Sequence, residues 1–358
     1  MFYSDCFVHK NVVKGEDKAM KETGEKRFDS ASLGVCDSVR KHLLALPSEI
    51  KNRAQEIRLR VGRPVTLCCP EGIYFLKNGG GIACTAGPNC VITGKNEVEE
   101  SFRILCGNSI YSHDTEIRNG YVTLRGGHRA GICGTSVFQN GTVSGLRDIS
   151  SINIRIAHEV PGCANAILGE LKNSLNGGLL LAGPPSSGKT TILRDIARQL
   201  SSGFYGNIYK VAVVDERGEI AGTYRGVPQN DIGICCDVLD SCPKTEGILT
   251  AIRTLSPQFI ICDEIGTEEE VRAVEQSLNA GVSVIASIHA GTKEELISRR
   301  QVASLLKTGA FQNVVLLRGS GKPGEISEIC MAGELLHEVG GSVAANSRGI
   351  SRGIYGIA

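Results

Sequence analysis

The hydrophobic positions along the chain follow two different patterns, and the change between them falls just after residue 158. Before this point, short apolar runs are broken by Gly, Pro and Asn, as in "GYVTLRGGHRAGICGTSVFQNGTV" (120–143). Such runs are typical of β-strands, and the pair Asn140-Gly141 is typical of a hairpin turn. With a helical pattern near its start, this part of the chain predicts an α+β domain over residues 35–158.

From residue 159 on, apolar strands alternate with amphipathic helical segments. The first three such segments are "GGLLLAG" (177–183), "TTILRDIARQL" (190–200) and "YKVAVVD" (209–215). Short apolar strands separated by helices indicate a parallel sheet that is covered on both faces. We therefore expect an α/β domain over residues 159–318.

The two ends of the chain lack a clear pattern. Residues 10–30 are rich in charge and poor in apolar residues, and we expect a disordered or loosely attached leader over residues 1–34. Residues 319–358 are rich in Gly and Ser, and we assign them only as a poorly defined tail.

Composition narrows the classes of protein. The 358 residues carry a formal net charge of +1, which gives no overall basic field for nucleic acid. No apolar run reaches the ~20 residues that a membrane span needs, and no signal peptide is evident at the start, so we expect a cytosolic protein. The 14 cysteines include no C-x-x-C pair, which favours buried, reduced thiols over a zinc site.

The segment "GPPSSGKTT" fits the P-loop pattern G-x-x-x-x-G-K-[ST], follows an apolar strand and opens a helix. Backbone N–H groups of such a loop surround nucleotide phosphates at a helix N-terminus. Lys189 is expected to reach the β- and γ-phosphates and Thr190 to hold Mg²⁺. The residues expected to bind the nucleotide are Gly183, Pro184, Pro185, Ser186, Ser187, Gly188, Lys189, Thr190 and Thr191.

Acidic residues follow two other predicted strands. "FIICDEI" ends in Asp263, expected to hold Mg²⁺, and Glu264, expected to orient or deprotonate the attacking water. "VAVVDERGEIAG" places Asp215, Glu216 and Glu219 after another strand, on the edge where the P-loop also lies. A solvated acidic turn is the alternative for this second segment.

"SVIASIHAG" raises a separate question, because an apolar run ends in His289 and the chain then turns. Taken alone, a histidine at a strand end is more often a structural residue than a ligand-binding one.

The order of these motifs resembles the secretion ATPases of type II and type IV systems, which have a Walker A motif, an Asp box, a Walker B motif and a His box. "EIRLRVGRP", "GLRDISSINIRIAHEVPGCA", "VDERGEIAG" and "LNAGVSVIASIHA" are similar, more closely, to segments of the stage III sporulation protein AA family. The resemblance covers about residues 45–318. It departs from many secretion ATPases at Asp263-Glu264, where these have Gly-Glu.

The resemblance implies a RecA-like ATPase core with a smaller N-terminal domain, and it implies roles for further residues. His289 falls at the His-box position and is expected to sense the γ-phosphate, although it remains possible that it only caps the following helix. Ring ATPases often supply an arginine from another domain or subunit. We favour Arg129 and Arg147 for this role, with surface arginines on hairpins as the alternative.

The expected function is therefore that of a Mg²⁺-dependent ATP hydrolase with ATP as ligand, working as a hexamer. The family implies a motor for a secretion-like channel between mother cell and forespore. It also implies attachment to the membrane through an integral membrane partner such as stage III sporulation protein AB, with no direct binding of nucleic acid. Two alternatives stay open: a RecA-like motor acting on DNA, and a nucleotide-controlled scaffold with little hydrolysis.

Overall fold

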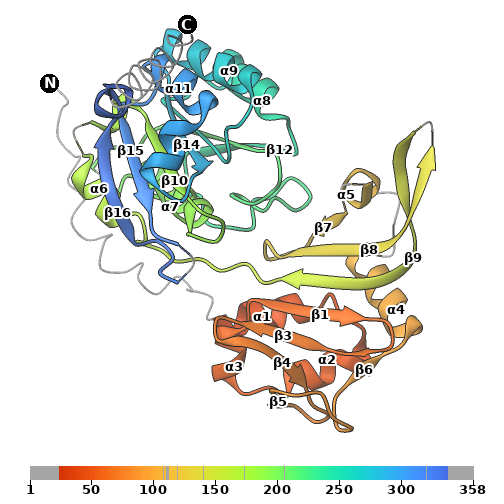
Figure 1. Ribbon diagram of the computed structural model, residues 1–358. Helices are drawn as coiled ribbons and strands as arrows, with labels where there is room; N and C mark the ends of the chain where they lie inside the picture. The colour runs from red at the N-terminus through yellow and green to blue at the C-terminus, as the bar shows by residue number, and fades with distance from the viewer. Residues whose placement is uncertain are drawn as a thin grey trace, which may run out of the picture. The chain divides into compact units, whose positions relative to one another are not determined.

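The computed structural model describes residues 24–337 except 108, 110–112, 119, 140, 173, 205 and 320. It divides into two compact units, Met1–His158 and Glu159–Ala358, which we call the N-terminal and C-terminal units. Each has its own sheet and its own core (Figure 1). No helix among the described residues is long and apolar enough to cross a membrane.

The N-terminal unit is built on an antiparallel sheet. Its seven strands run in the order β5-β4-β3-β1-β9-β8-β7, and a separate two-stranded sheet joins β2 and β6. The elements of this unit are α1 (Gly24–Ser32), α2 (Asp37–Leu44), α3 (Ser48–Arg53), β1 (Glu56–Arg60), β2 (Arg63–Pro64), β3 (Thr66–Cys69), β4 (Gly72–Leu76), β5 (Ile82–Ala83), β6 (Ile92–Thr93), α4 (Lys95–Leu105), α5 (Asp114–Arg118), β7 (Tyr121–Thr123), β8 (Arg129–Gln139) and β9 (Thr142–Arg155).

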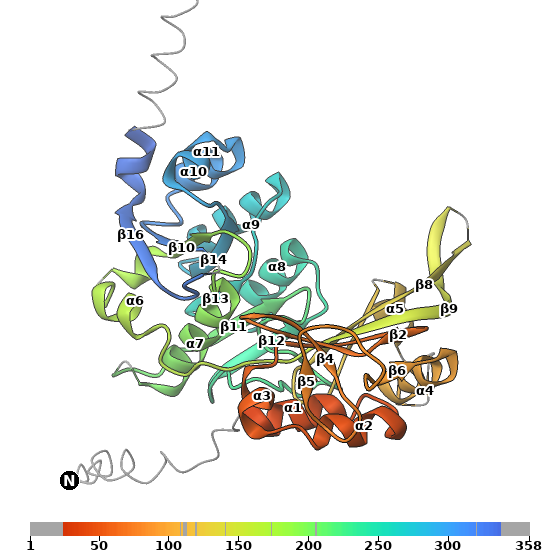
Figure 2. The same ribbon diagram turned by 60° about the horizontal axis from the view of Figure 1, so that its bottom comes forward.

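One face of this sheet carries the core. Alternate residues of β1 and β9, such as Ile57 and Ile152, are buried against α1, α2 and α4, whereas their neighbours are not. Figure 2 shows α1, α2 and α3 on one side of the sheet. The predicted hairpin is confirmed, because Gln139 pairs with Thr142 and Gly141 has φ +78°; Asn140 lies outside the described residues.

The C-terminal unit contains the predicted parallel sheet, in the order β12-β11-β13-β14-β10-β15-β16. All neighbours are parallel except β15 and β16. The elements are α6 (Asn165–Glu170), the 3₁₀ helix η3 (Leu175–Gly177), β10 (Leu179–Gly183), α7 (Lys189–Ser202), β11 (Val211–Asp215), β12 (Cys236–Asp240), α8 (Lys244–Thr254), β13 (Phe259–Cys262), α9 (Glu268–Asn279), β14 (Ser283–His289), α10 (Lys293–Ser298), α11 (Arg300–Lys307), β15 (Asn313–Leu317) and β16 (Ile326–Met331).

This sheet is covered on both faces, as the apolar strands predicted. Leu180 and Ala182 of β10 belong to a core with α8 and α9, whereas Leu179 and Leu181 belong to a core with α6 and α7. Since both faces are buried, the strands read as continuous apolar runs without alternation. The α/β class of the fold is confirmed.

The predictions for the two ends were wrong where the structure describes them. Residues 24–32 of the expected leader form α1, because Phe28 and Ala31 are fully buried in the N-terminal core while Lys51 forms an ion pair with Asp29 (2.9 Å). Residues 1–23 lie outside the described residues. In the expected tail, β16 pairs with β15 and buries Cys330, so the sheet gains a strand beyond residue 318.

Candidate active site

The carboxyl ends of the parallel strands bring the predicted motifs to one edge of the C-terminal sheet. β14 lies between β10, which leads into the P-loop, and β13, which leads into Asp263. Gly183 pairs with His289, and Cys262 pairs with Ala286. His289 is therefore placed between the P-loop and Asp263-Glu264 by the strand order itself.

The P-loop has the tight backbone that phosphate binding requires. Ser186 and Gly188 adopt positive φ values of +60° and +93°. A Cβ on Gly188 would lie 3.0 Å from the backbone nitrogen of Gly324, so this position needs glycine for space as well as for conformation. The ammonium of Lys189, the first residue of α7, donates to the carbonyl oxygens of Gly183 (2.8 Å) and Pro184 (2.9 Å).

His289 connects the P-loop lysine to the acidic residue of the Walker B segment. Its Nδ1 lies 3.2 Å from Lys189 Nζ, and its Nε2 lies 2.7 Å from Glu264 Oε1. With Nδ1 accepting from the ammonium, Nε2 carries the proton that is donated to Glu264. Glu264 Oε2 in turn lies 3.0 Å from Arg217 Nη1. These side chains form one continuous series, Lys189–His289–Glu264–Arg217.

Burial lowers the pKa of Lys189, an effect that the charges of Glu264 and Glu219 oppose. Lys189 is held between backbone carbonyls and an imidazole, all of which accept hydrogen bonds. Its ammonium therefore lies inside the loop, in the position that the P-loop pattern assigns to the phosphate-binding lysine.

Glu264 has an unusual backbone conformation for a residue other than glycine, with φ +32°. Its N–H donates to Ser287 Oγ (3.0 Å), and the N–H of Ile265 donates to the Ser287 carbonyl (2.9 Å). A strained residue of this kind costs roughly 1–3 kcal/mol and persists only where its surroundings hold it. Ser287, buried on β14, is part of what holds Glu264 toward His289.

Asp263 is a buried carboxylate without hydrogen bonds. It is 1% exposed, and neither oxygen accepts a hydrogen bond from any residue that the structure describes. Burial raises the pKa of Asp263 to about 7. The ammonium of Lys244 lowers this pKa, and the neighbouring carboxylates raise it further. A buried carboxylate that accepts no hydrogen bond and lies beside a P-loop fits a ligand of Mg²⁺. Thr190, half-buried next to Lys189, is the second residue expected to hold this ion.

The described part of the chain contains no cluster of three or more His, Cys, Asp or Glu residues that could hold a metal ion alone.

The acidic turn after β11 is organised by Asp215. This residue is fully buried, and its carboxylate accepts the backbone N–H groups of Glu219 (2.9 Å), Ile220 (3.2 Å) and Ala221 (2.8 Å). Glu216 instead forms an ion pair with Lys244 (2.8 Å). Asp215 thus shapes the turn, Glu216 is held by Lys244, and the roles of Glu216 and Glu219 toward a nucleotide stay predictions.

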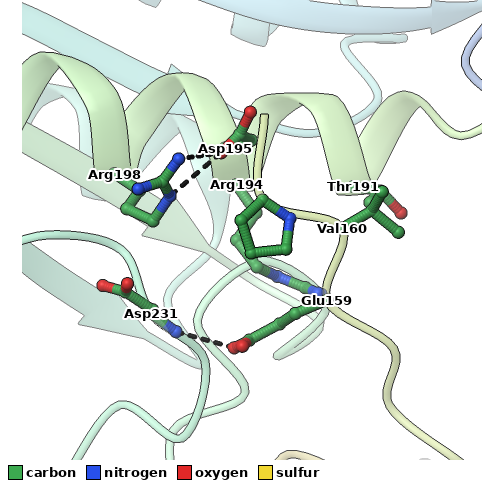
Figure 3. A pocket seen from close by; sticks show the side chains of 8 residues that line it. Glu159, Val160, Thr191, Arg194, Asp195, Arg198 and Asp231 are labelled. Carbon is green, nitrogen blue, oxygen red and sulfur yellow. Dashed lines mark hydrogen bonds and ion pairs between the residues drawn. The ribbon is translucent and has the colours of Figure 1, made fainter. Parts of the chain in front are cut away.

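A small cavity lies beside α7, where Thr191, Arg194, Asp195 and Arg198 line it (Figure 3). Arg198 is bonded to Asp195 (2.7 Å), and Glu159 accepts the backbone N–H of Asp231 (2.8 Å). The accessible volume of about 10 Å³ leaves room for one water, so we assign no ligand to this cavity.

The comparisons with known proteins agree with these motifs. Residues 28–334 match the model of the family described as "Sporulation stage III, protein AA". The chain belongs to this family. The stage III sporulation protein AA of Bacillus subtilis (strain 168) is 40% identical over 294 residues, which cover 82% of this chain and 92% of the relative.

Two solved structures share the fold of this family member at low sequence identity. One is the ATPase DotB of Legionella pneumophila, with 16% identity, a TM-score of 0.53, and coverage of 88% of this chain and 87% of DotB. The other is the pilus retraction motor PilT with bound ADP, with 15% identity, a TM-score of 0.51, and coverage of 82% and 85%. The predicted resemblance to secretion ATPases is confirmed at the level of fold.

The arginines favoured for action between subunits lie in the N-terminal unit. Arg129, on β8, has its guanidinium 3.6 Å from the centre of the Tyr121 ring. Arg147, on β9, is 69% exposed and lies 3.8 Å from Asp148. Both are on the antiparallel sheet or its long hairpin, and their role toward a nucleotide stays a prediction.

Sequence reasoning missed three residues around the site, Arg217, Lys244 and Ser287. Arg217 lies inside the quoted segment "VDERGEIAG", where only the acids were considered. Ser287 lies two residues before His289, so the alternation of side chains along a strand could have placed both on the same face of β14. Lys244 gave no comparable signal, because it opens a helix far from the motifs in sequence.

Proposed function

We propose that the chain is a Mg²⁺-dependent ATPase that works as a hexameric motor for a secretion-like channel assembled during sporulation. The observation that carries this proposal is the series Lys189–His289–Glu264 beside Asp263, whose buried carboxylate accepts no hydrogen bond, on the edge of a parallel sheet that also presents the P-loop.

In the proposed reaction, backbone N–H groups of Ser186–Thr191 and the ammonium of Lys189 hold the phosphates of ATP. Thr190 and Asp263 would hold Mg²⁺, which when bound would neutralise part of the charge of the phosphates. Glu264 orients the attacking water and accepts its proton, while the bond between the γ-phosphorus and its bridging oxygen breaks. His289 holds Glu264 through Nε2 and responds to the γ-phosphate through its contact with Lys189.

An arginine of a neighbouring subunit, Arg129 or Arg147, completes the site in this proposal by stabilising charge on the transferred phosphoryl group. The family supplies the biological setting: attachment from the cytoplasm to a membrane channel through a partner such as stage III sporulation protein AB. A scaffold with little hydrolysis is the weaker candidate, because Glu264 is the second acid of the Walker B pattern, which supports hydrolysis.

One observation favours a second candidate, a motor that acts on DNA. The face of the N-terminal sheet that lies opposite its core carries Arg58, Arg60 and Arg155, from strands far apart in sequence. Glu56 on the same face pairs with Arg58 (2.8 Å) and lies 3.9 Å from Arg155, so the basic charge of this face is partly balanced. Binding that weakens steeply with salt would support this candidate.

The decisive experiment measures phosphate release with Mg²⁺ and with excess chelator, and nucleotide affinity in parallel. Lys189→Ala removes charge-assisted contacts worth roughly 1.5–3 kcal/mol and is expected to weaken ATP binding by about tenfold or more. Lys172→Ala, at an exposed lysine of the same unit, is the matched control. Size-exclusion chromatography with and without ATP tests the hexamer. ATP binding that is unchanged in Lys189→Ala contradicts the proposal.

A further inference from the structure

Lys244 is a buried lysine that no part of the proposed reaction uses. It is the first residue of α8 and is 5% exposed. A buried ammonium is costly unless carboxylates surround it. Here three do: Nζ lies 2.8 Å from Glu216, 3.5 Å from Glu270 and 3.9 Å from Asp263.

The three carboxylates come from three separate elements that meet at the nucleotide edge. Glu216 belongs to the acidic turn after β11, Asp263 follows β13, and Glu270 lies in the first turn of α9. Burial disfavours the ammonium, but the hydrogen bond to Glu216 and the charges of Asp263 and Glu270 outweigh it and raise the pKa of Lys244. The ammonium is thus the common counter-charge of all three.

Glu270 extends this connection to the segment that contains Glu264. Its Oε2 accepts the backbone N–H groups of Gly266 (2.7 Å) and Thr267 (2.8 Å), and its own N–H donates to Thr267 Oγ1 (3.2 Å). Its other oxygen faces Lys244. The segment after the strained Glu264 is therefore fixed through a capping box whose carboxylate is anchored on Lys244.

The contacts of Lys244 are separate from those of the P-loop. Lys189 bonds to Gly183, Pro184 and His289, and none of these is a partner of Lys244. Loss of Lys244 should therefore disturb the placement of the acidic residues more than the binding of the phosphates. A misplacement of about 1 Å is enough to cost ~10²-fold in rate.

We infer that Lys244 is a positioning residue for hydrolysis: it holds the acidic turn and the segment Asp263–Thr267 in register at the nucleotide edge without touching the nucleotide. This inference rests on the proposed ATPase function. Lys244 lies on α8, outside the four motifs, and the rate of ATP hydrolysis is expected to depend on it.

The test compares Lys244→Met with Lys210→Met, a substitution at an exposed lysine of the same unit. In Lys244→Met, kcat is expected to fall at least tenfold, while KM for ATP and the affinity for ADP stay within threefold of the parent. Lys210→Met is expected to match the parent in all three quantities. A kcat of Lys244→Met within twofold of the parent overturns the inference.

A second variant separates positioning from folding. Lys244→Met leaves the buried carboxylates of Asp263 and Glu270 without their counter-charge, which lowers stability. The double variant Lys244→Met with Glu270→Gln removes one of these charges and keeps an oxygen for the N–H groups of Gly266 and Thr267, so its melting temperature is expected to rise toward that of the parent while kcat stays low. If kcat recovers together with stability, or if neither variant folds, Lys244 contributes only to the stability of the fold. Either outcome overturns the inference.

The outcomes distinguish this inference from the function on which it rests. A parent chain that binds ADP but releases no phosphate contradicts the ATPase proposal, whatever Lys244→Met does. An active parent with an equally active Lys244→Met contradicts the role of Lys244 alone.

Discussion

The two sheets of the molecule place functional side chains in different ways. In the C-terminal unit the strands are parallel, so residues that follow separate strands gather at one edge, and Lys189 and His289 meet at 3.2 Å although 100 positions separate them. In the N-terminal unit neighbouring strands run in opposite directions, so strand ends alternate between two edges. Its arginines are spread over a sheet face and a long hairpin.

This difference decides how well the order of motifs in the sequence predicts which side chains lie close together in the fold. A polar residue after an apolar strand has a predictable neighbourhood in a parallel sheet. In an antiparallel sheet, the same observation leaves both the edge and the face open, because register depends on the turns and on alternation. The charge balance differs as well: residues 24–158 contain more Lys and Arg than Asp and Glu, and residues 159–337 contain fewer.

The largest expected effect tests whether the N-terminal unit takes part in catalysis at all. An arginine acting between subunits contributes about 10³-fold or more to kcat. The double variant Arg129→Ala, Arg147→Ala should lose activity on this scale. Mixed with Lys189→Ala chains, it should regain part of the activity, because an intact P-loop then meets an intact arginine on its neighbour. Full activity of the double variant alone counts against a catalytic N-terminal unit.

Within the C-terminal unit, Glu264→Gln should have the next largest effect. The amide keeps the size of the side chain and an oxygen for His289 Nε2, but it cannot accept a proton from water. Phosphate release should fall by about 10²-fold or more while ATP binding remains. Glu269→Gln, at an exposed carboxylate of α9, is the control. A near-normal rate would transfer the role to Glu216 or Glu219, since backbone N–H groups occupy Asp215.

His289→Ala tests the connection between the two motifs and should have a smaller effect. The side chain is 39% exposed, so its removal should cost less than about 1 kcal/mol and shift the melting temperature by only a few degrees. ADP binding should be retained and ATP turnover should fall about tenfold, because the contact matters most when the γ-phosphate is present or leaving. His337→Ala is the control. A large fall in melting temperature with unchanged turnover per folded molecule would make His289 a structural residue.

The sequence predicted the α/β class, the parallel sheet and the edge on which its motifs meet, because each motif directly follows an apolar strand. It could not predict that β14 lies between β10 and β13, because strand order depends on how the crossovers pack. For the same reason the direct contacts of His289 with Lys189 and Glu264 were not foreseen.

The predictions for the two ends of the chain were wrong because the local composition did not indicate which residues are buried. The segment that forms α1 is strongly charged, and only Phe28 and Ala31 reveal its buried face. In β16 a single residue, Cys330, is buried, so a strand at the edge of the sheet showed no apolar run. Lys244 could not be found, because a lysine is expected in solvent, and its three carboxylates come together only in the folded chain.

The smallest expected effect on ATP turnover concerns a buried histidine of the N-terminal unit, which should affect stability instead. His128 is fully buried, and its Nδ1 accepts the backbone N–H of Ala157 (3.1 Å). Burial, with the nearby charges of Arg27 and His158, lowers the pKa of His128 to about 3. The unfolded chain therefore binds a proton at this residue near pH 6.5, whereas the folded chain does not until about pH 3. Stability from this site is complete above pH 6.5 and falls as the pH drops.

Linkage gives about 1.4 kcal/mol per pH unit in this range, or about 2 kcal/mol between pH 6.5 and pH 5. His128→Asn removes the titration and keeps an acceptor for the Ala157 N–H, because Asn Oδ1 occupies a place close to that of Nδ1. Urea unfolding at pH 7.5 and pH 5 should show the parent losing about 2 kcal/mol more than the variant over this interval. An equal loss in both would mean that His128 is protonated in the folded chain. Catalysis per folded molecule should not change, since this histidine contributes to the core of one unit and not to the chemistry of the other.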